Sequence, residues 1–144
     1  MTLTDLTDLA RGGVIPLDGA WGTELNRRGL PPGCAPEQWN LEQPARVAEV
    51  PRAYAAAGAR IVLTNTFGGS RYKLEKNGLA AHTAEINRAG ARISREAVPP
   101  GVLVCASIGP TGEFLEPLGE VAPAAMEDVF AEQIAALIDG GADL

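Results

Sequence analysis

The chain has 144 residues, of which 46% are hydrophobic and 21% charged, and its net charge is −6. This length suits one domain with a hydrophobic core. The acidic balance argues against nucleic acid or an anionic membrane as a partner, since both attract basic surfaces. Residues 1–13 lack the apolar core of a signal peptide and no run is long enough to span a membrane, so we expect a cytoplasmic protein.

The first elements are a helix and a short strand. Leucines at positions 3, 6 and 9 predict an amphipathic lead-in helix over 1–13, which Gly12 and Gly13 end. The apolar run at 14–19 predicts a strand that finishes in Asp18-Gly19. A long loop rich in proline and glycine follows, of the kind that α/β proteins use to build sites.

A helix should lead into the second strand. Val47, Val50, Tyr54 and Ala57 share one helical face, but Pro51 falls inside the pattern and should kink the helix or restart it. Two near-continuous apolar runs, 60–67 and 102–109, predict strands that are covered on both faces.

Two more helices complete the pattern. Apolar residues at helical spacing predict one over 83–98, and a clear apolar stripe predicts another over 123–141, with Pro123 in its first turn and Gly140 at its end. Alternating strands and helices indicate a parallel sheet of the α/β class. Because the chain has no glycine-rich phosphate-binding motif, a (β/α) barrel is favoured over a nucleotide-binding fold.

The last residues repeat an earlier junction. Residues 141–144 (Gly-Ala-Asp-Leu) resemble 58–61 (Gly-Ala-Arg-Ile), which join a helix to a strand. We therefore expect Leu144 to be the second residue of a fourth strand, and the chain to be a fragment or to be completed by another part.

Polar or flexible segments follow each predicted strand. These are Asp18-Gly19, Asn65-Thr66-Phe67 and the loop 107–119. Each has a simple structural alternative: a turn pair, a polar strand cap and ordinary turn chemistry. Three such features on one rim of a parallel sheet favour a pocket, since this rim is where α/β barrels carry their sites.

The remaining reactive residues have simpler interpretations. We expect Cys34 and Cys105 to be free thiols, the first exposed in a loop and the second buried in a strand. His82 is expected to be solvated or to cap a helix start, and the charges around Glu75 are expected to form a helical surface. Their spacing predicts no metal site.

Five stretches resemble the homocysteine S-methyltransferase family, which includes cobalamin-dependent methionine synthase and betaine–homocysteine methyltransferase. They are 17–30, 37–79, 85–97, 107–119 and 127–144, in the family's order. The chain departs from the family at Trp21, where methionine is expected, and at Pro51, where histidine is common.

The resemblance implies a parallel (β/α)8 TIM barrel, of which residues 1–144 are the N-terminal part of the single homocysteine-binding domain, about the first three and a half βα units. It implies that Asp18, Gly19, Asn65, Thr66 and Phe67 bind the amino-acid part of homocysteine. It also implies a zinc held by three cysteines of later strands, outside this chain, so neither metal ligands nor catalytic residues are assigned here.

These implications define an activity and an alternative to it. The family transfers a methyl group from an activated donor to the zinc-bound thiolate of homocysteine, giving methionine, and cobalamin or folate would bind through other domains. The isolated chain, lacking the zinc ligands, is expected to be inactive. The alternative is a truncated half-barrel that serves as a binding or structural module. In either case we expect self-association through open sheet edges, or pairing with the missing C-terminal half.

Overall fold

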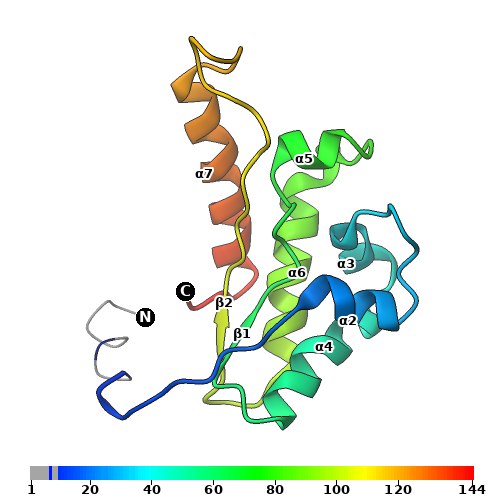
Figure 1. Cartoon of the computed structure of the whole chain (residues 1–144), viewed down its shortest axis with the longest axis vertical. Helices are drawn as coiled ribbons and strands as arrows, with labels where there is room; N and C mark the ends of the chain where they lie inside the picture. Colours follow the sequence, from blue (N-terminus) through cyan, green and yellow to red (C-terminus); the bar gives the residue numbers. More distant parts are fainter. Residues whose placement is uncertain (1–6, 8–9) are drawn as a thin grey trace.

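The computed structural model describes residues 7 and 10–144 (Figure 1). The predicted lead-in helix over 1–13 lies largely outside the described residues. From Trp21 onward the elements are α2 (Trp21–Arg27), η1 (Pro36–Gln38), α3 (Trp39–Glu42), α4 (Pro44–Ala56), β1 (Ile61–Leu63), α5 (Arg71–Glu75), η2 (Ala80–His82), α6 (Thr83–Ala97), β2 (Leu103–Cys105) and α7 (Pro123–Asp139). None of the described helices is long and apolar enough to cross a membrane.

The two strands are parallel, as predicted for an α/β chain. Ile61 pairs with Leu103, Val62 with Val104 and Leu63 with Cys105. Both strands are shorter than the predicted runs 60–67 and 102–109, because side-chain hydrogen bonds replace the backbone ladder beyond residues 63 and 105.

The predicted strand over 14–19 is reduced to a single parallel bridge between Leu17 and Ile61. Pro16 has no N–H to donate, and its carbonyl oxygen accepts hydrogen bonds from the backbone N–H groups of Arg60 (2.9 Å) and Ile61 (3.4 Å). A strand of six residues was therefore wrong, although the pairing lies on the expected side of β1.

The end of the chain lies beside β2. Asp143 N–H and Leu144 N–H donate to the Val104 carbonyl oxygen at 2.8 and 3.2 Å, and Ala106 N–H donates to Leu144 O at 2.7 Å. No strand is assigned there, but the hydrogen bonds have the position that a fourth strand would require. The segments thus follow the order 17, β1, β2, 143–144.

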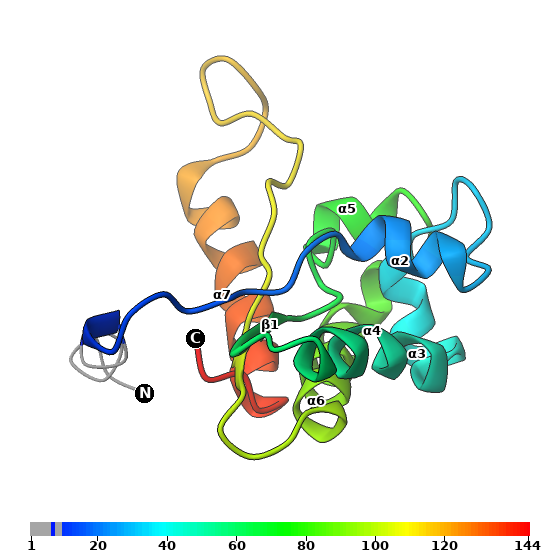
Figure 2. The ribbon, with the colours of Figure 1, turned by 60° about the horizontal axis from the view of Figure 1, so that its bottom comes forward.

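The described helices cover one face of the strands. Figure 1 shows α6 between α7 and α4, and Val62 and Val104, both fully buried, pack in one core cluster with Ala59, Val98 and Val102. Figure 2 turns the molecule and shows the N-terminal segment running across the front of this view, past β1 and into α2.

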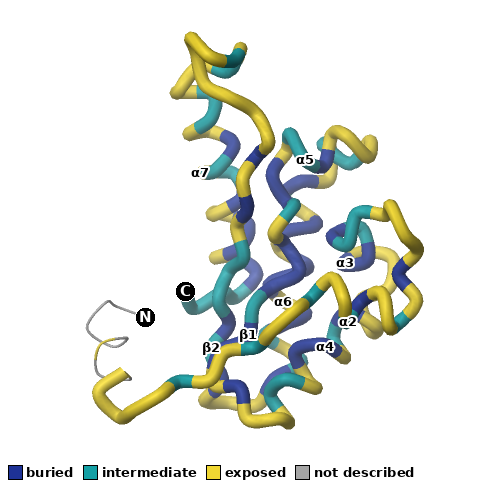
Figure 3. Tube along the Cα trace, viewed as in Figure 1, coloured by how far each residue is buried: buried dark blue, intermediate teal, exposed yellow. Residues whose placement is uncertain are grey.

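The second face of the strands is only partly covered. Leu63, Leu103 and Cys105 are half-buried (Figure 3). The expectation of two covered faces, and of a buried Cys105, was wrong, because no described element packs against this side. Burial still raises the pKa of the Cys105 thiol, and the charge of Asp18 adds to the effect.

A second core cluster joins the N-terminal helices to α6. It contains Leu25, Leu30, Trp39, Val47, Val50 and Ile93. Pro51 lies inside α4, which continues to Ala56, so a restart of the helix at this residue was wrong. Pro123 at the start of α7 and Gly140 at its end confirm the predicted boundaries.

Candidate functional site

A cavity of about 440 Å³ lies where β1 ends. Its walls come from four parts of the chain: residues 19–22, η1, residues 63–68 and Ser107. The lining residues are Gly19, Trp21, Gly22, Pro36, Glu37, Leu63, Thr64, Asn65, Thr66, Phe67, Gly68 and Ser107.

Two threonine hydroxyls join the ends of the strands at the base of this cavity. Thr66 Oγ1 donates to Ser107 O at 2.8 Å, and Thr64 Oγ1 accepts from Ser107 N–H at 2.9 Å. The hydroxyl oxygens also contact each other. Because the Thr66 proton is used on Ser107, Thr64 must be the donor in that contact. Side chains thus take over where the backbone ladder stops.

Asn65 connects the cavity wall to the N-terminal helices. Its Nδ2 donates to Pro36 O at 2.8 Å and to Asn40 Oδ1 at 2.9 Å. In return, Asn40 Nδ2 donates to Asn65 O at 2.8 Å and to Ile86 O at 3.1 Å. Both asparagines are buried, so their amides act within the protein and hold the wall in place.

A second amide pair fixes the following turn. Asn87 Nδ2 donates to Gly69 O and Thr83 O, both at 2.7 Å. Gln133 Nε2 donates to Thr66 O at 2.9 Å and to Asn87 Oδ1 at 3.0 Å. Both side chains are fully buried. The carbonyl groups of residues 65, 66 and 69 therefore receive their donors from α3, α6 and α7.

Asp18 lies beside the cavity. Its Oδ2 accepts from Leu63 N–H at 2.7 Å and from Trp21 Nε1–H at 2.8 Å, and both donors belong to lining residues. Its Oδ1 is buried without a hydrogen-bond partner among the described residues. Burial raises the pKa of the Asp18 carboxyl, while the two hydrogen bonds act in the opposite direction.

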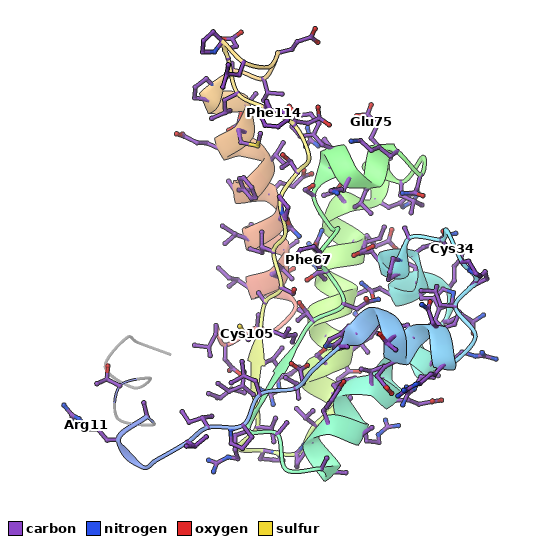
Figure 4. The ribbon with its side chains drawn as sticks, viewed as in Figure 1. Arg11, Cys34, Phe67, Glu75, Cys105 and Phe114 are labelled. Carbon is purple, nitrogen blue, oxygen red and sulfur yellow. The ribbon has the colours of Figure 1, made fainter. Side chains whose placement is uncertain are left out.

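Four of the five predicted site residues line the cavity: Gly19, Asn65, Thr66 and Phe67. Asp18 does not, because its carboxylate is turned to Leu63 and Trp21. Asn65 and Thr66 also use their side chains for structural hydrogen bonds, as the polar strand cap would. Phe67 differs, since it is 61% exposed and its ring is free to contact a ligand (Figure 4).

Glu37 lines the cavity but was not among the predicted site residues. It stands after a proline in a loop, and no local pattern marks its burial. Trp21 was noted only as a departure from the family, and the helix that it begins, α2, was not predicted. The pair Glu24–Arg28, which forms an ion pair one turn apart, is the signal that could have found α2.

None of the other reactive side chains that the structure describes lines the cavity. Cys34 and Cys105 are both free thiols, and Figure 4 shows them on different sides of the molecule. His82 is exposed and lies 3.0 Å from the Glu85 carboxylate. Among residues 7 and 10–144, no three His, Cys, Asp or Glu side chains are grouped so that they could hold a metal ion. The zinc that the resemblance implies has no ligand set here.

The amino-acid sequence matches a known protein family and two methionine synthases. The family model "Homocysteine S-methyltransferase" matches residues 15–144. Methionine synthase of Mycobacterium tuberculosis is 33% identical over an alignment of 154 residues, which covers 97% of this chain and 13% of that protein. Methionine synthase of Mycobacterium leprae is also 33% identical, with 97% and 12% covered.

A solved structure agrees with the sequence matches. The homocysteine methyltransferase MmuM from Escherichia coli, in its metallated form, superposes with a TM-score of 0.81 at 26% identity, over 96% of this chain and 55% of that one. Its oxidised form gives a TM-score of 0.77, with 91% and 51% covered. The chain thus spans about half of MmuM and a smaller part of the methionine synthases. Because the family model matches residues 15–144, the chain belongs to the homocysteine S-methyltransferase family.

Proposed function

We propose that this chain forms the amino-acid side of a homocysteine site, within a protein that transfers a methyl group to the homocysteine thiol and so produces methionine. The observation that carries the proposal is the cavity at the carboxyl ends of parallel strands, with Gly19, Asn65, Thr66 and Phe67 in its walls. Binding sites concentrate at this end of (β/α) barrels.

The described residues are suited to holding the substrate. Asp18 Oδ1 is buried beside the cavity without a hydrogen-bond partner among the described residues, so an ammonium group would use this acceptor only after a side chain of the wall moves aside. Asn65 and Thr66 would act indirectly, because their amide and hydroxyl groups fix the backbone of the wall. The exposed ring of Phe67 would pack against the aliphatic part of the ligand.

Activation of the sulfur would come from elsewhere. A free thiol has a pKa near ~8.5, so it is mostly protonated at neutral pH, and a bound metal ion would convert it to the thiolate. The metallated relative supports a metal in the family, and the resemblance implies that cobalamin or folate would bind through other domains. The described residues do not fit such a metal, so their part is to bind and orient.

A binding titration tests the proposal. L-Homocysteine and 4-mercaptobutyrate, which lacks the amino group, should be titrated into the full chain by calorimetry. We expect homocysteine to bind at least about tenfold more tightly, since a charge-assisted hydrogen bond would be missing from the analogue. Asp18→Asn should remove most of the difference, whereas Asp139→Asn on the exposed end of α7 should not. Equal affinities in the unsubstituted chain would contradict the proposal.

A second function is favoured by one observation. Because no metal-binding group is present among the described residues, the chain could serve as a non-catalytic half-barrel module. Such a module would form a stable complex with a separate second half of the barrel. A stable complex of the two halves that forms no methionine would favour this role, whereas methionine formation on mixing would favour the first proposal.

A further inference from the structure

We infer that Glu37 is a positioning residue for the substrate cavity: its carboxylate fixes the peptide between Phe67 and Gly68 and thereby places the Phe67 ring. The inference rests on the proposed function, because it assigns to Glu37 a role in binding homocysteine.

The Phe67–Gly68 peptide is held at both of its polar groups. Its N–H, on Gly68, donates to Glu37 Oε1 at 2.7 Å. Its carbonyl oxygen, on Phe67, accepts from Gly109 N–H at 3.0 Å. Since a peptide unit is planar, two hydrogen bonds from opposite directions determine its orientation, and with it the direction of the neighbouring side chain.

Two glycines make the close approach possible. A Cβ atom on Gly68 would lie 2.9 Å from Glu37 Oε1. A Cβ on Gly109 would lie 2.5 Å from Phe67 O and 2.9 Å from the ring. A side chain at residue 109 would therefore collide with the backbone of Phe67, whereas one at residue 68 would displace the Glu37 carboxylate.

Glu37 is unusual for a glutamate in being only 6% exposed. It forms no ion pair with any residue that the structure describes. A buried carboxylate needs donors, and the Gly68 N–H supplies one. The element that carries it is anchored in turn, because Asn65 Nδ2 donates to Pro36 O. Glu37 therefore holds the peptide from a fixed point.

The contact also forms part of a wall. Glu37 and Gly68 line the cavity of about 440 Å³ and also a second one of about 240 Å³, which includes Cys34 and Lys73. Loss of the contact would open a path between these two spaces. The ring of Phe67, which is mostly exposed, would then lose the constraint that keeps it at the first cavity.

Amide hydrogen exchange on the isotope-labelled full chain tests the clamp directly. In Glu37→Ala we expect exchange of the Gly68 and Gly109 amides to accelerate about tenfold or more, because a hydrogen bond to a charged group is lost. Glu37→Gln, whose side-chain oxygen can still accept, should restore most of the protection. Glu42→Ala, at an exposed glutamate of α3, is the matched control and should change neither amide.

Homocysteine titration of the same variants tests the link to the substrate. Glu37→Ala should weaken binding about tenfold and Glu37→Gln about threefold, and both effects should vanish when Phe67→Ala is already present. Unchanged exchange at Gly109, or a loss of affinity that persists without the Phe67 ring, would overturn the inference. If Glu37→Ala does not fold, the cycle with Glu37→Gln decides. If the unsubstituted chain binds no homocysteine, the proposed function fails, while the exchange rates still decide whether the clamp exists.

Discussion

Asn87 offers the sharpest test of how the cavity wall is held. Its fully buried side chain makes three hydrogen bonds, to Gly69 O, to Thr83 O and from Gln133 Nε2. We consider Asn87→Ala, which removes all three at once, and Asn87→Asp, which keeps the shape of the side chain but replaces its two N–H donors with an acceptor.

The cost of Asn87→Ala follows from what each partner retains. The Thr83 carbonyl keeps its helical partner within α6, and Gln133 Nε2 keeps Thr66 O at 2.9 Å. The Gly69 carbonyl loses the donor that Asn87 gave it. A buried unsatisfied group costs about 1–3 kcal/mol and a lost hydrogen bond about 1 kcal/mol, so we expect the free energy of unfolding to fall by about 2–4 kcal/mol.

Asn87→Asp should be worse at neutral pH. The new carboxylate would face the carbonyl oxygens of Gly69 and Thr83 without a proton to offer either of them. Its pKa in the folded chain would lie above its unfolded value, so the folded state would bind the proton more tightly. The stability of this variant relative to the unsubstituted chain should therefore rise as the pH falls through that pKa.

Urea unfolding followed by circular dichroism measures both effects, with Asn77→Ala at an exposed asparagine as the control. The control should change the free energy of unfolding by less than about 0.5 kcal/mol. A loss of less than about 1 kcal/mol for Asn87→Ala, or a carboxylate tolerated as well as the alanine at pH 7, would refute the reasoning.

Three further predictions concern charge, metal and assembly. Because burial raises the pKa of Asp18, the unsubstituted chain should gain melting temperature relative to Asp18→Asn as the pH falls from 7 toward 4, and a constant difference would contradict this. Elemental analysis after dialysis should find far less than one zinc per chain, and Cys34→Ser and Cys105→Ser should not alter it; stoichiometric zinc lost on either change would place the metal here. Because Ile134 and Ile138 are 44% and 66% exposed on α7, sedimentation velocity should show self-association at micromolar concentration that Ile138→Lys reduces. A monomer at all concentrations would count against association through this helix face and through the open sheet edges.

The long helices could be predicted because their signals are local. Pro123 and Gly140 mark both ends of α7, and the apolar spacing of α6 needs no knowledge of its partners. The second and third predicted strands were placed correctly but were too long, and the first is only a bridge at Leu17. The point where backbone pairing gives way to Thr64, Thr66 and Ser107 depends on the neighbouring segment. Local sequence carries no information on that point.

The site also combines features that local sequence predicts with features that depend on distant residues. A polar end to β1 predicted that Asn65 and Thr66 would stand at a cavity, and they do. That their side chains would be occupied by Pro36, Asn40 and Ser107 depends on residues far along the chain. For the same reason Glu37 could not be found, because its burial is produced by tertiary packing and not by its own segment.

The hydrogen bond from the Gln133 amide affects the order in which parts of the chain can fold during synthesis. It donates to the carbonyl of Thr66, a residue 67 positions earlier in the chain. A ribosome releases Thr66 first, so the wall of the cavity must wait for most of α7 to emerge before its last donor arrives. During synthesis the turn after β1 is therefore finished late, although the strand that leads into it is made long before α7.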